Sequence, residues 1–363
     1  MKIAILANSD IGLYKFRKEL VEQLCIDNEV YIILPKGEFI DRLKGIGCKY
    51  IQFDFNRRGM NPVADLKQLK NYLQILKNIN PGLVLTYTIK PNVYGGIACK
   101  KLRIPCIANI TGLGTSIENG GFVAKVSTTL YKIGLKEAEC VFFQNIDNKN
   151  FFEKKKIVEG RTRLIPGSGV NLETHTLEPY PEDKDGIRFL FVGRIMKDKG
   201  IEELLSAISD IHKANGNVVV DIVGFCDEDF SEQLKKAEAE GSIVFYGLQS
   251  DVHPFYKKCH CAVLPSYHEG MANVMLEAAS TGRPVITTKV PGCQETFDEG
   301  VTGFGCEVKD TDSLKSAMLR FLNLSQEKRK EMGLAARRKM EREFDRNLVI
   351  ESYQEEIERI TQQ

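Results

Sequence analysis

Long apolar runs are missing from this chain of 363 residues. No stretch approaches the ~18 consecutive apolar residues that a membrane-spanning helix needs. The first apolar segment already becomes polar at Asn8, which is too early for a secretory signal peptide. We therefore expect a cytoplasmic protein with no helix across the bilayer.

The cysteines lack the spacing of a disulfide framework or of a zinc site. The 10 cysteines are scattered, and several lie in apolar segments, as expected of reduced thiols in a cytoplasmic protein. Cys259, His260 and Cys261 are adjacent, but no second pair accompanies them, whereas structural zinc sites show paired cysteines. We expect no metal site, and we place Cys261 in the core.

The first loop of the chain lacks the glycines of a dinucleotide-binding domain. Residues 7–14 contain one glycine, Gly12, where the approach of a pyrophosphate requires G-x-G-x-x-G. This absence argues against an oxidoreductase that binds a nicotinamide cofactor.

Apolar segments alternate with helical segments twice along the chain, without an internal repeat. The first set comprises residues 2–6, 30–34, 50–53, 83–86, 105–110 and 141–144, and the second comprises residues 189–193, 218–223, 243–246, 262–264 and 284–287. Such alternation predicts parallel sheets with helices on both faces. The chain length suits two α/β domains, with a boundary near the Pro-Gly-Ser-Gly segment 166–169 and a long charged helix at about residues 326–362.

Two carboxylates mark the most informative segment, residues 269–277. Glu269 and Glu277 lie eight positions apart around the start of a predicted helix, after a buried strand. Helix N-termini carry unpaired backbone N–H groups that bind phosphate. We assign that role here to Gly270, Met271, Ala272 and Asn273. Because a carboxylate repels phosphate, we expect Glu269 to accept hydrogen bonds from sugar hydroxyls and Glu277, a little over two turns away, to bind a ribose.

Two cations follow another buried strand. The apolar segment 188–193 ends directly before Arg194, and Lys199 follows five residues later. The carboxyl end of a strand is where open α/β sheets bind ligands. Cations, a helix N-terminus and paired glutamates together predict a nucleotide-sugar site.

These segments resemble the retaining nucleotide-sugar glycosyltransferases of family four. The resemblance rests on Gly193-Arg194 with Lys199-Gly200, on residues 265–277, and on residues 292–295 followed by Gly303-Phe304. It covers essentially the whole chain and implies the α/β GT-B fold, with two Rossmann-like domains facing a central cleft. The implied parts are an acceptor-binding domain at 1–166, a nucleotide-sugar-binding domain at 167–340, and a C-terminal helix at 341–363 that returns to the first domain.

Within that family the chain looks most like enzymes that extend undecaprenyl-diphosphate-linked sugars, including bacterial N-acetylgalactosaminyltransferases. Residues 14–17, 90–92 and 111–114 carry this likeness. It implies transfer of a hexose or N-acetylhexosamine, with retained configuration, from a UDP-sugar to a lipid-diphosphate-linked saccharide of a capsule or other surface glycan. The implied catalytic residues are Glu269, Arg194 and Lys199, the two cations stabilising the leaving diphosphate without a metal ion or cofactor.

The first domain is expected to bind the acceptor, and Gly12 to face the donor. Relatives commonly have two glycines in this loop, where the chain has Ile11-Gly12. The candidate acceptor-binding residues are Arg17, Lys90, Asn92, Thr111 and Gly112. Many relatives also have a histidine in this domain, but the first histidine of this chain is His175, so Thr111 or Asn92 is expected in its place. Arg17 and Lys90 are equally interpretable as surface charges of helices.

The net charge of +1 hides an asymmetry between the two halves. Residues 1–166 carry 26 Lys and Arg against 15 Asp and Glu, and the remainder carries 24 against 34. Anionic lipid attracts Lys and Arg by about 1 kcal/mol each, so we expect the basic half to bind the inner face of the cytoplasmic membrane. The candidate helices are residues 66–77 and 122–136, the second with Lys125, Lys132 and Lys136. Nucleic acid is not an expected partner, because no binding motif is present and the other half is acidic.

Two rival functions remain open at this point. A sugar-nucleotide epimerase or hydrolase of the same fold would turn over the donor without an acceptor, and a binding module would bind the donor without releasing a product. The base, the sugar and the linkage are not specified by the sequence.

Overall fold

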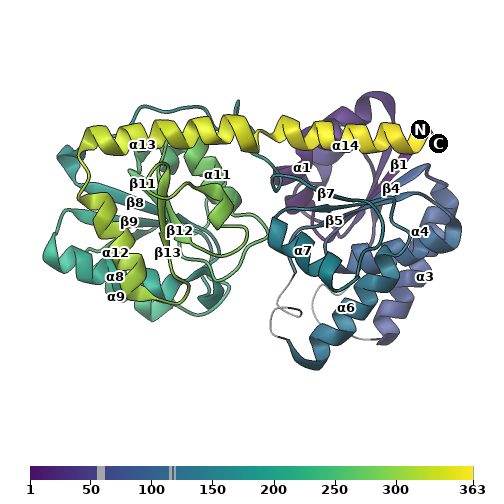
Figure 1. Ribbon diagram of the computed structural model, residues 1–363, viewed down its shortest axis with the longest axis horizontal. Coiled ribbons are helices and arrows are strands. Elements are labelled where there is room, and N and C mark those ends of the chain that lie inside the picture. Colours follow the sequence, from purple (N-terminus) through teal and green to yellow (C-terminus); the bar gives the residue numbers. More distant parts are fainter. Residues whose placement is uncertain (55–61, 114–116, 118–119, 363) are drawn as a thin grey trace. The chain divides into compact units, whose positions relative to one another are not determined.

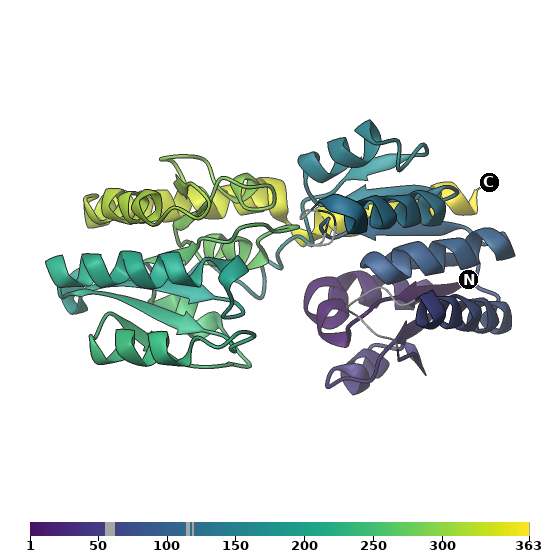
Figure 2. The ribbon, with the colours of Figure 1, turned by 90° about the horizontal axis from the view of Figure 1, so that it is seen from below.

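The protein folds into two compact α/β units in a computed structural model that describes residues 1–54, 62–113, 117 and 120–362. Unit 1 consists of Met1–Ser168 and Asn347–Gln363, and unit 2 of Gly169–Arg346. Each unit has one parallel sheet with helices on both of its faces (Figures 1 and 2). The first boundary lies two residues after the predicted position of 166, and the return to unit 1 lies six residues after the predicted position of 341.

Unit 1 contains seven parallel strands in the order β3-β2-β1-β4-β5-β6-β7. The strands are β1 (Lys2–Leu6), β2 (Glu29–Leu34), β3 (Lys49–Gln52), β4 (Leu83–Tyr87), β5 (Cys106–Ile110), β6 (Cys140–Phe143) and β7 (Thr162–Leu164). The apolar pattern predicted the first six to within one residue. It missed β7, because this edge strand has three residues and none of them is fully buried.

Helices connect and cover these strands. They are α1 (Asp10–Asp27), α2 (Ile40–Gly45), α3 (Pro62–Ile79), the π-helical turn η1 (Pro91–Gly95), α4 (Gly96–Leu102), α6 (Gly121–Leu135), α7 (Ile146–Lys154) and α14 (Arg346–Thr361). Side-chain caps fix two of their starts. The Ser9 hydroxyl accepts from the N–H of Gly12 in α1 (3.4 Å), and the Asn145 side chain accepts from the N–H of Asn148 in α7 (2.8 Å). Such caps satisfy N–H groups that the helix itself leaves unpaired.

The C-terminal helix α14 is part of the core of unit 1. Tyr353 is fully buried, and Asn109 Nδ2 on β5 donates to its hydroxyl at 2.8 Å. The sequence predicted one helix over residues 326–362, and this is wrong, because the helix is interrupted at Asp345. There the chain is extended and forms an isolated β-bridge with Val170.

Unit 2 contains six parallel strands in the order β10-β9-β8-β11-β12-β13. They are β8 (Ile187–Val192), β9 (Val218–Val223), β10 (Ile243–Phe245), β11 (Cys261–Leu264), β12 (Val285–Thr288) and β13 (Gly303–Cys306). The pattern did not predict β13, because two of its four residues are glycines, which are poor strand formers.

Helices connect the strands of unit 2, and most of them bury part of their surface. They are η2 (Asp183–Asp185), η3 (Lys197–Lys199), α8 (Ile201–Ala214), α9 (Ser231–Ala239), α10 (His253–Lys258), α11 (Asn273–Ser280), η4 (Gln294–Thr296), α12 (Thr311–Leu322), α13 (Gln326–Lys339) and the π-helical turn η5 (Met340–Phe344). In α8, the buried residues Leu204, Ile208 and Ile211 follow helical spacing, whereas the short turns η2 and η3 bury no residue. In the described parts of the chain, no helix combines the length and apolar character needed to cross a bilayer.

Candidate functional site

The predicted donor residues other than Gly12 lie around the point in unit 2 where the strand order reverses. From β8 the sheet continues through β9 and β10 on one side, and from its neighbour β11 through β12 and β13 on the other. Ligands of open α/β sheets bind outside the carboxyl ends of such neighbouring strands. Arg194 and Lys199 follow β8, and Glu269 and Glu277 follow β11, so all four belong to this reversal point.

The loop after β8 is fixed against the loop after β11. The Tyr267 N–H donates to the Asp198 carbonyl at 2.9 Å. Gly200 has φ 69°, and a Cβ there would lie 2.1 Å from the carbonyl oxygen of Pro265. Only glycine permits this approach. It brings Lys199 to Glu269, and the two form an ion pair with side chains 17% and 16% exposed.

The loop after β12 joins the same cluster. Gly292 has φ 82°, and a Cβ there would lie 2.4 Å from the carbonyl oxygen of Glu269. The Gly292 N–H donates to Glu295 Oε2 at 2.7 Å. Three loops, from β8, β11 and β12, therefore hold Glu269 in a fixed position.

Part of the predicted phosphate-binding backbone is already used within the chain. The Ala272 N–H donates to the Gly292 carbonyl at 2.7 Å, and the Asn273 N–H donates to the Met271 carbonyl at 2.9 Å. Helix α11 begins at Asn273, later than the sequence indicated. The prediction of unpaired N–H groups is therefore wrong for Ala272 and Asn273. Gly270 and Met271 lie in the loop before the helix.

Glu277 lies on α11 and has a tyrosine partner that the sequence did not suggest. The Tyr256 hydroxyl on α10 donates to Glu277 Oε2 at 2.8 Å. Burial raises the pKa of Tyr256 well above its usual value, and the charge of Glu277 raises it further. The hydroxyl therefore keeps its proton and acts as a donor at neutral pH.

Arg194 has a different environment from Lys199. Its guanidinium Nη1 lies 2.8 Å from Asp227 Oδ2, and its side chain is 45% exposed. Asp227 belongs to the loop after β9. Sequence reasoning missed both Asp227 and Tyr256, because neither lies in a motif and each reaches the site through tertiary folding alone.

Two of the predicted acceptor residues are charged groups with partners inside unit 1. Arg17 is buried rather than at a helix surface, and its guanidinium lies 5.5 Å from the ring centre of Tyr87. Lys90 Nζ lies 2.9 Å from Asp65 Oδ1, with side chains 13% and 9% exposed. The alternative interpretation of these residues as surface charges is therefore wrong for Arg17 and fits Lys90 poorly.

Asn92 is a structural residue of unit 1. It is 1% exposed, it accepts a hydrogen bond from the Thr86 hydroxyl (2.7 Å), and it donates to the carbonyl of Asn109 (2.8 Å). The predicted role of Asn92 in holding an acceptor is therefore not supported by its environment. Thr111 and Gly112 are half-buried at the carboxyl end of β5, whereas residue 114 of the same predicted loop lies outside the described residues.

The start of α1 fits a phosphate poorly. Asp10 is buried in the first turn of this helix and accepts a hydrogen bond from the Phe39 N–H at 2.8 Å. The negative charge of this carboxylate opposes that of a phosphate at the same helix start. Gly12 lies in the same turn, with only Ser9 within 4 Å of a hypothetical Cβ, so no close backbone approach requires a glycine at this position.

Metal ligands do not gather in the described parts of the chain, where no group of three or more His, Cys, Asp or Glu side chains has suitable geometry. All ten cysteines are described, and all are free thiols. Cys259 and Cys261 are fully buried, and His260 Nδ1 accepts a hydrogen bond from the Arg188 N–H at 3.0 Å.

Two sequence families match the two units. The family "glycosyl transferases group 1" matches residues 174–339, and "glycosyl transferase 4-like" matches residues 2–145. Among curated relatives, the N,N'-diacetylbacillosaminyl-diphospho-undecaprenol alpha-1,3-N-acetylgalactosaminyltransferase of Campylobacter jejuni is 27% identical, over 99% of both chains. The capsular polysaccharide biosynthesis glycosyltransferase CapM of Staphylococcus aureus is 27% identical, over 81% of both chains.

Solved structures share the fold at lower identity. Sucrose-phosphate synthase from Thermosynechococcus elongatus superposes with a TM-score of 0.80 at 20% identity, over 99% of both chains. Anabaena HepE in complex with UDP and glucose gives a TM-score of 0.80 at 18% identity, also over 99% of both chains. With both units matched and Arg194, Lys199, Glu269 and Glu277 gathered after β8 and β11, the chain belongs to the group 1 glycosyltransferases and has the GT-B fold.

Proposed function

We propose that this glycosyltransferase moves a hexose or N-acetylhexosamine from a UDP-sugar to a lipid-diphosphate-linked saccharide in surface polysaccharide assembly. The observation that carries the proposal is the joining of three loops at the reversal point of unit 2, which fixes Glu269 beside Lys199. A carboxylate paired with a cation at this position suits a ligand that has both hydroxyls and a diphosphate.

The donor would be bound by side chains more than by backbone. Lys199 and Arg194 are the cations available for the diphosphate, and each stabilises the charge that develops as it leaves. Glu269 would accept hydrogen bonds from sugar hydroxyls next to Gly270 and Met271, and Glu277 would bind the ribose. Ala272 and Asn273 would shape the site without donating their N–H groups.

The acceptor class is inferred from the names of two relatives. The Campylobacter jejuni enzyme and the Escherichia coli UDP-Gal:alpha-D-GlcNAc-diphosphoundecaprenol alpha-1,3-galactosyltransferase, 26% identical over 72% of both chains, both carry a diphosphoundecaprenol acceptor in their names. In unit 1, Thr111 and Gly112 lie in the loop after β5 and Lys90 in the turn after β4. These residues are our candidates for contact with the acceptor.

Unit 1 also offers a surface suited to anionic lipid. Helix α6 exposes Phe122 (79%) and Ile133 (49%), and the start of α3 exposes Val63 and Leu66. Three lysines in or next to α6 are exposed as well: Lys125, Lys132 and Lys136. Exposed apolar side chains beside lysines are typical of helices that lie at a membrane interface. We propose peripheral attachment to the inner face of the cytoplasmic membrane.

The proposed chemistry keeps the anomeric configuration and uses no metal ion. The bond from the anomeric carbon to the diphosphate oxygen breaks, and a bond to the acceptor oxygen forms on the same face. The acceptor's proton passes to the departing diphosphate, whose charge Arg194 and Lys199 stabilise. No separate base is needed among the side chains of the site.

The test is incubation of the purified chain with a panel of UDP-sugars, with and without an undecaprenyl-diphosphate-linked saccharide. We expect donor consumption only when the acceptor is present, and NMR of the product should show the anomeric configuration of the donor. Consumption without acceptor would favour the epimerase or hydrolase, and binding without turnover would favour a binding module. A product of inverted configuration would contradict the retaining mechanism.

A further inference from the structure

We propose that Tyr256 is a positioning residue that orients the Glu277 carboxylate for the ribose, and that buried Arg283 holds Tyr256 in place. This inference rests on the proposed function of Glu277 and adds to it a second layer of residues. Binding of the ribose would then depend on two helices, α10 and α11, rather than on one glutamate.

Tyr256 is built into the core and reaches Glu277 with its one polar atom. Its side chain is 0% exposed, and its hydroxyl donates to Glu277 Oε2 at 2.8 Å. The same hydroxyl lies 3.4 Å from the carbonyl of Val274, one turn before Glu277 on α11. A buried hydroxyl can donate only one proton, so its bond to the charged carboxylate is the stronger of the two.

Arg283 fixes the backbone of the two helices that carry this pair. Its guanidinium is fully buried and donates to carbonyl groups of three segments. The acceptors are Tyr256 (2.7 Å), Lys257 (2.9 Å), Thr281 (3.1 Å), Gly282 (3.4 Å), Glu178 (3.3 Å) and Pro179 (2.9 Å). Two of these residues lie in the last turn of α10, two directly follow α11, and two belong to the segment before β8.

The chemistry of helix ends explains why an arginine is suited to this position. The last carbonyl groups of a helix have no partner within it and carry partial negative charge. Five N–H donors in one plane can satisfy carbonyls from both helix ends at once. Arg283 therefore ties the end of α10 to the end of α11, and the distance between Tyr256 and Glu277 follows from that tie.

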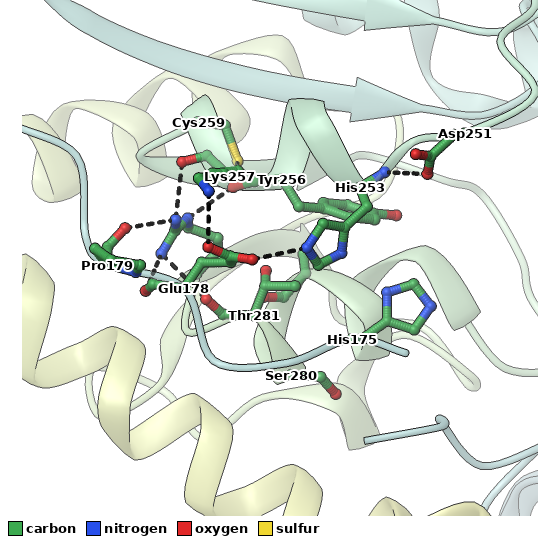
Figure 3. A network of polar contacts seen from close by, with 12 residues as sticks. His175, Glu178, Pro179, Asp251, His253, Tyr256, Lys257, Cys259, Ser280 and Thr281 are labelled. Atoms are coloured by element: carbon green, nitrogen blue, oxygen red, sulfur yellow. Dashed lines mark hydrogen bonds and ion pairs between the residues drawn. The ribbon is translucent and has the colours of Figure 1, made fainter. Parts of the chain in front are cut away.

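A second group of contacts connects the side chains of α10 to Glu178 in the segment before β8. Glu178 lies between two residues of α10, with Oε1 2.9 Å from His253 Nε2 and Oε2 3.4 Å from Lys257 Nζ (Figure 3). The hydrogen bond from His253 holds the pKa of Glu178 below its usual value. These contacts connect α10 to the segment that Arg283 also binds, so the helix is held at both ends.

The test compares binding of two probes, UDP and 2′,3′-dideoxy-UDP, by isothermal titration calorimetry. The parent protein should prefer UDP by about 10-fold or more, since the ribose hydroxyls meet a charged acceptor. Tyr256→Phe should weaken UDP by about 3- to 10-fold and leave the dideoxy probe unchanged within about twofold. Tyr180→Phe is the matched control. This variant also loses one hydrogen bond from a tyrosine hydroxyl, but the acceptor is the carbonyl of His260 (2.8 Å) and not Glu277.

Glu277→Gln separates the two levels of the inference. If this variant keeps the parent's preference for UDP, the ribose role of Glu277 fails, and with it the basis for Tyr256. If Glu277→Gln loses the preference while Tyr256→Phe keeps it, the positioning role alone is overturned. Equal weakening of both probes in Tyr256→Phe would mean a general structural defect and would also overturn the proposal. Circular dichroism and thermal unfolding of each variant establish that it is folded.

Discussion

The two cations of the donor site are each paired with a carboxylate of the same chain. Lys199 is paired with Glu269 and Arg194 with Asp227, so each cation of the site has a carboxylate beside it. A diphosphate that binds there competes with these carboxylates. The two pairs differ in exposure, since Arg194 is 45% exposed and Lys199 17%. Arg194 is therefore the freer of the two to turn toward a ligand.

Arg194→Ala should lower the rate of transfer by about 100-fold, because it removes a charge-assisted donor from the transition state. Lys197→Ala is the control, since Lys197 lies in the same loop with a side chain 60% exposed, and it should retain the parent rate. Steady-state kinetics with and without a chelator measure both effects. Full activity of Arg194→Ala contradicts the assignment, and loss of activity in chelator contradicts the metal-free mechanism.

The two glutamates should respond differently to amide substitution. Glu277→Gln should weaken both the UDP-sugar and free UDP, because the ribose is common to them. Glu269→Gln should leave UDP binding intact or strengthen it, because Lys199 loses its carboxylate partner, while transfer falls by about 100-fold. Calorimetric titration with UDP decides the question. Equal losses of UDP affinity in both variants would show that the two roles are not distinct.

The sequence indicated which candidate residues would follow β8 and β11, but it did not indicate their partners. Arg194, Lys199, Glu269 and Glu277 lie in the connections that follow two apolar strands, and the ends of parallel strands meet at one edge of a sheet. Tyr256 and Asp227 reach the site from other strand connections, and nothing in their local sequence marks them. The internal hydrogen bonds of Ala272 and Asn92 likewise depend on distant backbone, so no local pattern could predict them.

At the scale of elements, buried strands were predictable from apolar runs, and edges and interruptions were not. Strand β7 is short and half-exposed, and β13 is rich in glycine, so neither produces an apolar signal. The break before α14 arises because Asp345 pairs with Val170, which is 175 positions away along the chain. The tertiary contact thus overrides the local helix propensity of the sequence at this point.

Helix α14 is joined to the edge of the unit 1 sheet by a buried carboxylate. Glu356 is 1% exposed and lies 2.7 Å from Arg161 Nε, 3.2 Å from Arg163 Nη1 and 2.9 Å from Arg359 Nε. Burial acts to raise the pKa of Glu356, but the hydrogen bonds from the three arginines outweigh it, and the pKa is lowered. A carboxyl whose pKa is lowered by folding stabilises the fold at pH values above its unfolded pKa of about 4.3. This stabilisation is lost as the pH falls below that value.

Glu356→Gln should therefore lower the free energy of unfolding by about 1–3 kcal/mol at pH 7, and the difference should shrink as pH falls below about 4.3. Urea unfolding of the parent and the variant at pH 7 and at low pH measures it. Glu355→Gln is the control, since Glu355 is 64% exposed and bonds to Arg163 alone in that network. A penalty for Glu356→Gln that is independent of pH would mean that packing, and not charge, explains the effect.

At the scale of the whole molecule, charge is divided unevenly along the chain. The first 166 residues are basic and the remainder is acidic, a division that composition reveals without any structure. The structure adds that lysines and large apolar side chains share the exposed face of α6. Composition alone does not specify which helix combines both, because that depends on which residues the fold buries.

Replacing Lys125, Lys132 and Lys136 with Gln should reduce attachment to vesicles containing acidic lipid and slow transfer to a lipid acceptor. Attachment of the parent should also weaken with salt, because the screening length falls to about 3 Å at 1 M. Co-sedimentation with vesicles measures attachment, and transfer to a short soluble acceptor should remain largely intact. Lys213, Lys235 and Lys236 of unit 2, all exposed, form the control triple. Parent-like attachment of the first triple at low salt would show that α6 is not the docking surface.

The order in which the two units fold during synthesis follows from the discontinuous sequence of unit 1. Unit 2 is continuous, but unit 1 needs α14, whose Tyr353 fills its core against Phe142 at a ring distance of 4.5 Å. The first 168 residues therefore cannot complete their core until unit 2 and α14 have been synthesised. Domains generally fold as they emerge from the ribosome. Unit 2 is thus the first to reach its final fold, and a nascent chain that stops before α14 exposes apolar core to chaperones and proteases.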